Sequence, residues 1–174
     1  MAENIEQKTI DIIQALVHDA FNENSVLDRC KTILTTDLAF PVTGNLVHML
    51  AHKYPIQIAD TLGDIIENRN QPVEYGNIEP HKEVYMSVKE AMDKVHDSVI
   101  VYQNELNKAA KDILTQTYDM DAYNGVMAVI AEHKKYVDQV IQWKDIVDRY
   151  GDNPSLDVHM KDYDMLGLGG WQLC

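Results

Sequence analysis

The chain has 174 residues, 45% of them apolar, and this length predicts one domain with a single sizeable core. Its formal net charge of −13 argues against nucleic acid as a partner, because phosphate would be repelled, and favours the attraction of cations. No apolar run approaches the roughly 18 residues of a membrane helix and the N-terminus shows no signal peptide, so we expect a cytoplasmic protein without a membrane partner.

The first predicted helix covers residues 5–36, where apolar side chains recur with the helical period and form a broad stripe. The polar run at 22–25 weakens this pattern, and Ser25 could cap a new helix. The segment is therefore either one long helix or two short helices joined at residues 22–24.

The second predicted helix covers residues 44–69, after a loop at 40–44. Pro55 lies inside it and removes a backbone hydrogen bond, which predicts a kink or a break. Pro72 and the polar residues before it end the helix. Residues 70–80 then form the longest loop, and an extended link of this length reaches most of the about 45 Å of a thirty-residue helix.

Residues 81–115 show the cleanest helical pattern, with apolar side chains every three or four positions and no glycine or proline. A short turn at 115–117 follows, and we expect Asp119 to cap the fourth helix, residues 119–149. The Gly-Asp-Asn-Pro run at 151–154 ends this helix.

Four long helices, with a long link between the second and the third, predict an all-α fold. The expected architecture is a ferritin-like antiparallel four-helix bundle, in which that link crosses the length of the molecule. We expect the bundle domain to cover residues 1–151. Residues 152–174 show no periodicity and predict an irregular C-terminal tail, whose Trp171 either docks on the body or a neighbouring subunit or belongs to a disordered end.

The second helix carries the most informative side chains. His48 and His52 lie one turn apart on one face, and each could bind a metal through a neutral ring nitrogen. Asp60, Asp64 and Glu67 form an acidic stripe that is rotated from the histidines by roughly a quarter turn or more. One helix cannot close a site from both groups, but two copies packed antiparallel across a two-fold axis can. The alternatives are a histidine pair at a helix interface and a solvated acidic face.

Histidines on the later helices offer a different metal site. In a bundle di-metal centre, two helices carry Glu-x-x-His and the other two carry single glutamates. The chain has no Glu-x-x-His; it offers Asp93-x-x-His96 and, on the apolar face of the last helix, His133. A di-metal site within one subunit is therefore short of carboxylates, and we expect His133 to be a satisfied core histidine. The two cysteines lack a CxxC spacing, and we find no zinc motif, phosphate loop or nucleophile elbow.

The stretch from Gly44 to Arg69 resembles the second helix of Dps proteins, the ferritin-like mini-shells named as DNA-binding proteins from starved cells. His48 matches an iron-binding histidine of that family, and His52 stands where the family usually has an aspartate. Glu67 matches the late glutamate that binds iron from a second subunit.

The sequence departs from the Dps pattern at several positions. The other late acid of the family falls at Gly63, with Asp64 next to it. The His-Trp-Asn signature at the end of the first helix is missing, since Thr36 and Asp37 occupy that region, and Arg69 falls one residue late. The ferritin-like resemblance is therefore broader than the resemblance to Dps.

These resemblances imply an iron-binding homo-oligomer with His48, His52, Asp64 and Glu67 as ligands at a subunit interface. Such a protein oxidises ferrous iron with oxygen or peroxide, as a ferroxidase-type oxidoreductase, sequesters it in a hollow shell and protects against stress; another divalent metal would suit the same ligands. DNA binding in the family often relies on basic tails, and this tail is acidic. The alternative is a non-catalytic ferritin-like structural or interaction module with a degenerate metal site.

Overall fold

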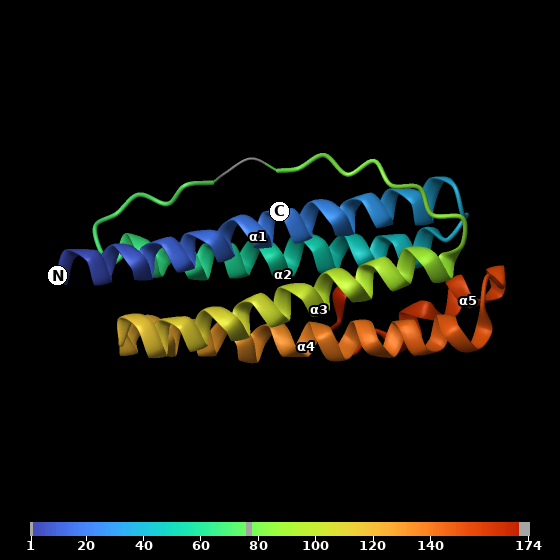
Figure 1. Cartoon of the computed structure of the whole chain (residues 1–174). Helices are drawn as coiled ribbons and strands as arrows, with labels where there is room; N and C mark the ends of the chain where they lie inside the picture. The colour runs from blue at the N-terminus through green and yellow to red at the C-terminus, as the bar shows by residue number, and fades with distance from the viewer. Residues whose placement is uncertain (1, 76–77, 171–174) are drawn as a thin grey trace.

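Four long helices pack side by side along most of their length, as Figure 1 shows. The computed structural model describes residues 2–75 and 78–170. The long helices are α1 (Ala2–Thr36), α2 (Pro41–Glu67), α3 (Val88–Asp112) and α4 (Met120–Tyr150), and the shorter elements are η1 (Ile113–Thr117), α5 (Pro154–His159), η2 (Met160–Tyr163) and η3 (Leu168–Gly170). Because these residues contain no strand, the predicted all-α bundle with a long link between the second and third helices is confirmed.

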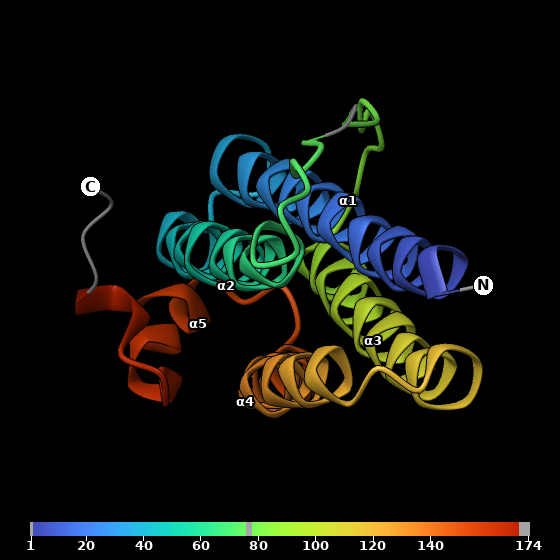
Figure 2. The ribbon, with the colours of Figure 1, turned by 90° about the vertical axis from the view of Figure 1, so that its left-hand side faces the viewer.

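The bundle consists of two antiparallel hairpins, α1–α2 and α3–α4. Seen along the bundle axis, α1 has α2 and α3 as neighbours, and α4 packs against α3 and α2 (Figure 2). The buried apolar side chains of all four helices join into one core. Within the described ranges, none of the helices is both long enough and apolar enough to cross a membrane.

The first helix runs without interruption from Ala2 to Thr36, so the single long helix is the correct one of our two alternatives. The polar run at 22–25 does not end the helix, because two of its side chains lie against the rest of the bundle. Asn24 Nδ2 donates to the carbonyl of Ala51 on α2 at 3.0 Å. Glu23 is buried in the interior of the bundle.

The start of α2 is held by a residue from the C-terminal segment. The helix begins at Pro41, three residues before the predicted start, and proline suits this first helical position. Phe40 before it supplies no side-chain cap. Instead, the carboxylate of Asp157 accepts hydrogen bonds from the N–H groups of Val42 at 3.0 Å and Thr43 at 2.8 Å, and the Thr43 hydroxyl donates to it at 2.7 Å.

A close approach to α1 and an internal proline mark the rest of α2. A Cβ atom on Gly44 would collide with Thr35 Oγ1 and lie 3.1 Å from the carbonyl oxygen of Lys31, so glycine suits this position, where α2 packs tightly against the end of α1. Pro55 lies inside α2, and the helix continues through it to Glu67. The predicted break at this proline therefore does not occur.

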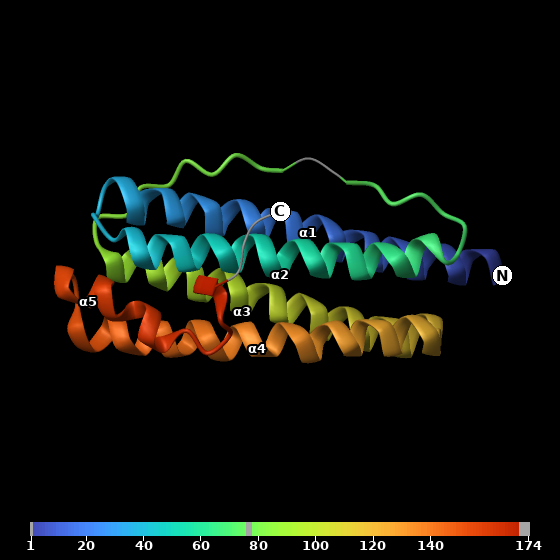
Figure 3. The ribbon, with the colours of Figure 1, turned by 180° about the vertical axis from the view of Figure 1, so that it is seen from behind.

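The crossover between α2 and α3 follows Glu67, and its described parts, residues 68–75 and 78–87, lie along α1 (Figures 1 and 3). His18 Nε2 on α1 lies 2.9 Å from the carbonyl oxygen of Glu74. Farther along, Arg29 Nε donates to the carbonyl of Glu83 at 3.0 Å. The crossover is thus longer than the predicted loop and is fastened to the outside of the first helix.

The third helix begins seven residues after the predicted start at position 81. Ser87 Oγ accepts from the N–H of Glu90 at 3.1 Å, and the Glu90 carboxylate accepts from the N–H of Met86 at 2.7 Å. This reciprocal arrangement is a form of capping box, and the Ser-x-x-Glu spacing in the sequence is typical of it. Val84 fits the helical period but lies 66% exposed on the crossover, so periodicity alone placed the start too early.

A π-helical segment, η1, joins α3 to the turn before α4. The turn passes through Tyr118, whose φ of 56° is in the left-handed region. Asp119 then caps α4 as predicted, accepting from the N–H of Ala122 at 2.9 Å. The same carboxylate pairs with Arg69 at 2.7 Å, which joins the end of α2 to the start of α4.

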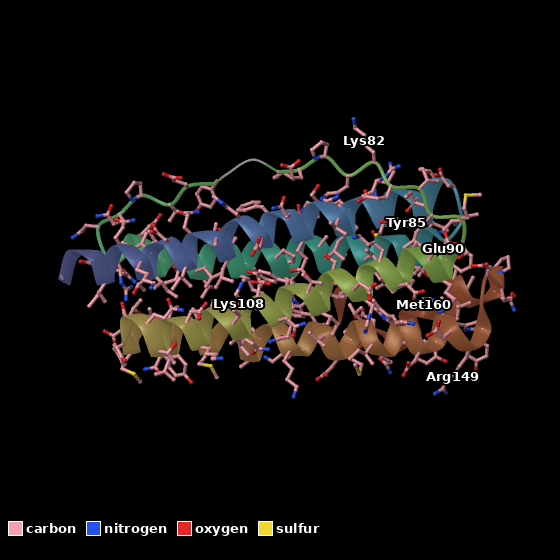
Figure 4. The ribbon with its side chains drawn as sticks, in the orientation of Figure 1. Lys82, Tyr85, Glu90, Lys108, Arg149 and Met160 are labelled. Carbon is pink, nitrogen blue, oxygen red and sulfur yellow. The ribbon has the colours of Figure 1, made fainter. Side chains whose placement is uncertain are left out.

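The C-terminal segment folds back beside α2 and α4 (Figures 2 and 3). Gln139 Nε2 of α4 donates to the carbonyl of Tyr163 at 2.7 Å, and Met160, labelled in Figure 4, is fully buried. The longest element here, α5, has six residues, which explains why positions 152–174 show no helical period. Trp171, for which we expected either docking or disorder, lies outside the described residues.

Replacing the capping carboxylate, Asp157→Ala, takes the partner from two N–H groups at the start of α2, that of the partly buried Val42 and that of the buried Thr43. We expect the free energy of unfolding to fall by about 2 kcal/mol, as measured by urea denaturation. Asp162→Ala removes an exposed carboxylate from the same segment and should change stability by less than about 0.5 kcal/mol. Equal effects of the two substitutions would show that the cap contributes nothing.

Candidate metal centre

Three side chains from α1 and α2 meet on one side of the first hairpin. Asp28 Oδ1 lies 2.8 Å from His48 Nδ1, and Asp28 Oδ2 lies 3.1 Å from His52 Nε2. The two imidazole rings lie 4.4 Å apart between centroids, at an angle of 67°. All three side chains are partly buried, so the cluster is supported by the protein and open to solvent.

The geometry of the hairpin brings these residues together. Since α1 ends at Thr36 and α2 begins at Pro41, residues equally far from this short loop lie side by side. Asp28, eight residues before Thr36, and His48, seven after Pro41, nearly meet this condition, and His52 follows one turn farther along α2. Asp28 was not among the residues that the sequence predicted for the site, because finding it requires the true bounds of the loop, and the sequence predicted a loop that reaches residue 44.

The donor set suits a divalent transition metal. Two imidazole nitrogens and one carboxylate oxygen lie within 4.8 Å of one another. Two histidines and one carboxylate with open positions are the ligand set typical of non-haem Fe(II) sites. In the part of the chain that the structure describes, no other group of three His, Cys, Asp or Glu side chains is this compact.

Within one chain, the predicted carboxylates Asp64 and Glu67 lie far from the histidines. They follow His48 by 16 and 19 positions on the same helix, which corresponds to about 24 and 28 Å along its axis. Both carboxylates are exposed. Only a second subunit could bring them to the cluster of Asp28, His48 and His52.

A second polar group lies in the interior of the bundle. Glu23 of α1 is 5% exposed and His133 of α4 is 1% exposed. His133 Nδ1 lies 3.0 Å from Gln103 Oε1, and His133 Nε2 lies 3.6 Å from Glu23 Oε1. Glu23 Oε2 has no hydrogen-bond partner among the described residues, and burial raises the pKa of this carboxyl above its usual range.

The other histidine of the alternative di-metal site lies elsewhere. His96 is partly exposed on α3 and its Nδ1 lies 3.1 Å from Asp97 Oδ1. Asp93, three residues before it, forms ion pairs with Lys89 and Lys144 at 3.5 and 2.8 Å. The structure therefore brings Glu23, not His96, to His133.

Solved structures of other proteins share this architecture. No protein-family model and no curated protein matches the sequence. An open-pore ferritin from the hyperthermophilic archaeon Archaeoglobus fulgidus matches with a TM-score of 0.79 and 15% identity, over 95% of this chain and 99% of that chain. The fold is ferritin-like. A closed form engineered from the ferritin of the same organism matches with a TM-score of 0.77 and 13% identity, over 91% and 95% of the two chains. The ferritin-like part of our prediction is confirmed, and at these identities the similarity concerns the fold alone.

The buried Glu23 gives folding a specific pH dependence. Since its pKa is raised in the folded state, the native protein holds the proton longer than the unfolded chain, and stability is lost as the pH rises from about 4.5 through the folded pKa. One such group can contribute a slope of up to about 1.4 kcal/mol per pH unit. Glu23→Gln should remove this slope and unfold at higher urea than the wild type at pH 8.

The matched control is Glu132→Gln, which removes an exposed carboxylate from α4. Urea unfolding at several pH values between 4.5 and 8 makes the comparison. Parallel curves for the wild type and Glu23→Gln would show that Glu23 titrates as an ordinary carboxylate.

Proposed function

We propose that this protein binds ferrous iron at Asp28, His48 and His52 and oxidises it there. The observation that carries the proposal is the two-histidine, one-carboxylate cluster, which is the ligand set that Fe(II) favours and which leaves positions open for an oxidant. The ferritin-like fold supports the same function, because the matched structures are ferritins. The net charge of −13 favours accumulation of iron around the protein.

The chemistry follows from the three side chains. Each imidazole binds iron through a neutral nitrogen, so binding releases any proton held there and replaces the hydrogen bonds to Asp28. The carboxylate compensates one positive charge and stabilises the ferric product more than the ferrous substrate. Each Fe(II) gives one electron to oxygen or peroxide, and the product leaves through the solvent-facing side of the cluster.

We further propose a Dps-like arrangement in which two subunits share the site. A two-fold axis beside the middle of α2, near the exposed Gln57, would place the partner's Asp64 and the partner's Glu67 beside His48 and His52. The added carboxylates would supply more oxygen ligands for a ferric product. Self-association is therefore part of the proposed function.

A second candidate function, a non-catalytic ferritin-like structural or interaction module, is favoured by one observation. Asp28 already hydrogen-bonds both histidines, so the cluster is complete without a metal. For a metal-binding protein, we expect stoichiometric iron, manganese or zinc in material purified without chelators. Consistently sub-stoichiometric metal would favour the module.

The double variant His48→Ala/His52→Ala removes both imidazole ligands. We expect anaerobic Fe(II) affinity to fall by at least about 100-fold, since losing even a residue that supports a ligand costs 10- to 100-fold. Catalysed oxidation in air should fall to the rate in buffer. His96→Ala removes a partly exposed histidine from α3 and should change neither measurement. Unchanged oxidation in the double variant would refute the proposed function.

The shared site is tested by Asp64→Asn/Glu67→Gln. If the partner's carboxylates complete the site, the oxidation rate per subunit should fall about tenfold or more while His48 and His52 still bind iron. Asp60→Asn, at another exposed carboxylate of α2, is the control. A normal rate in the double carboxylate variant would leave the three residues of one chain as the whole site.

A further inference from the structure

A groove follows the seam between α1 and α3, which lie side by side in Figure 2. Its main part has a volume of about 440 Å³, and an adjoining hollow of about 150 Å³ shares Asp19 and Glu105 with it. Together the two hollows follow α1 from Ile12 to Val26, which corresponds to about 21 Å along the helix axis. We call them the α1–α3 groove. Its length suits a short segment of a protein chain.

Apolar side chains lie in the α1–α3 groove between charged ones. Val101 of α3 lines the main part and is 60% exposed, and Val26 of α1 lines the same part. The adjoining hollow is lined by the small side chains of Ala15 and Ala109, which leave room beside them. Apolar surface with a polar rim is typical of places where another protein packs.

Carboxylates outnumber ammonium groups in the lining of the groove. The carboxylates are those of Asp19, Glu23, Asp97, Glu105 and Asp112, against the ammonium groups of Lys94 and Lys108. Asp19 forms no ion pair within the described ranges, and burial and the charge of Glu105 both raise the pKa of its carboxyl group. Glu105 pairs with the exposed Lys108 of its own helix, labelled in Figure 4, at 3.4 Å. A basic partner would therefore complement this surface.

The floor of the groove independently indicates a missing partner. Glu23 contributes to the lining, and its Oε2 is buried without a hydrogen-bond partner among the described residues. An arginine side chain carries five N–H donors at the end of a long apolar stem. Inserted beside Val101, such a stem would direct donors from the mouth of the groove toward its floor. Arginine is also enriched among the residues that dominate the energy of protein interfaces.

Other occupants fit the groove less well. A second copy of this chain, with its net charge of −13, would be repelled from an acidic surface, and the self-association proposed above uses α2 instead. Nucleic acid would be repelled in the same way. Among the described residues, no three carboxylates of this lining lie within 4.8 Å of one another, so the groove is not a chelating site.

We propose that the α1–α3 groove docks a basic amphipathic helix of another protein. An arginine of this helix enters between Asp19 and Glu105, and an apolar side chain three or four positions away packs on Val101, since residues at this spacing share one face. Because much of the attraction is between solvent-exposed charges, binding weakens as salt is added. The groove shares no residue with the cluster of Asp28, His48 and His52, so the proposal does not depend on iron oxidation.

The probe is a fluorescein-labelled synthetic helix that carries arginine and leucine on one face, and fluorescence anisotropy measures its binding to the full chain. We expect saturable binding, with a dissociation constant about tenfold higher for Asp19→Asn/Glu105→Gln, because the variant loses both charges that flank the arginine. Val101→Ser leaves the net charge unchanged and should raise the dissociation constant about fivefold, since it removes apolar contact area. Circular dichroism of each variant confirms that it is folded.

The matched controls lie on α4. Glu132→Gln/Asp145→Asn removes two exposed carboxylates, and Ile141→Ser removes an apolar side chain that is 40% exposed. Both should bind the peptide as the wild type does. Equal weakening by the two carboxylate pairs, or equally tight binding of a scrambled peptide of the same composition, would overturn the docking site, because only net charge would then matter. Displacement of the peptide by an equal concentration of spermine would overturn the protein partner in favour of a small polyamine.

Discussion

The close antiparallel pairing of α1 with α2 is the constraint on which the candidate metal centre depends. The short loop between Thr36 and Pro41 sets which residues face each other, and Gly44 lets the helices approach at their joined end. That register puts Asp28 beside His48 and His52. A shift of one helical turn between the two helices would separate Asp28 from both histidines.

The two polar groups differ in how the protein treats them. The cluster of Asp28, His48 and His52 is partly exposed, and its polar atoms are satisfied because the Asp28 carboxylate hydrogen-bonds both imidazoles. The pair of Glu23 and His133 is almost fully buried and leaves one oxygen of the Glu23 carboxyl group without a partner among the described residues. An unsatisfied buried oxygen costs stability, and such oxygens are rare in native proteins. The cluster of Asp28, His48 and His52 is therefore the better-formed candidate metal site, and the pair of Glu23 and His133 is the greater anomaly.

The sequence predicted the helices well because their apolar period is regular, and it predicted the crossover because a long polar link separates two such periods. Its errors came at helix ends. The start of α3 was placed too early because Val84 continues the period of the helix by chance, whereas the cap at Ser87 decides the boundary. At the candidate site, His48 and His52 were recognisable because they share one helix. Asp28 was not, because the contact joins two helices and depends on the register between them. The hydrogen bonds between Asp157 and the start of α2 could not be predicted from the sequence either, since no local pattern links residues so far apart.

The hydrogen bonds from the start of α2 to Asp157 also affect the order in which the chain folds. Asp157 is 114 positions away from Thr43 along the chain, so the first turn of α2 stays uncapped until nearly the whole polypeptide has left the ribosome. The α1–α2 hairpin can pair early through its local contacts, but the end nearest the histidines is completed last. That end of the hairpin therefore stays frayed until the segment that carries Asp157 has packed against it.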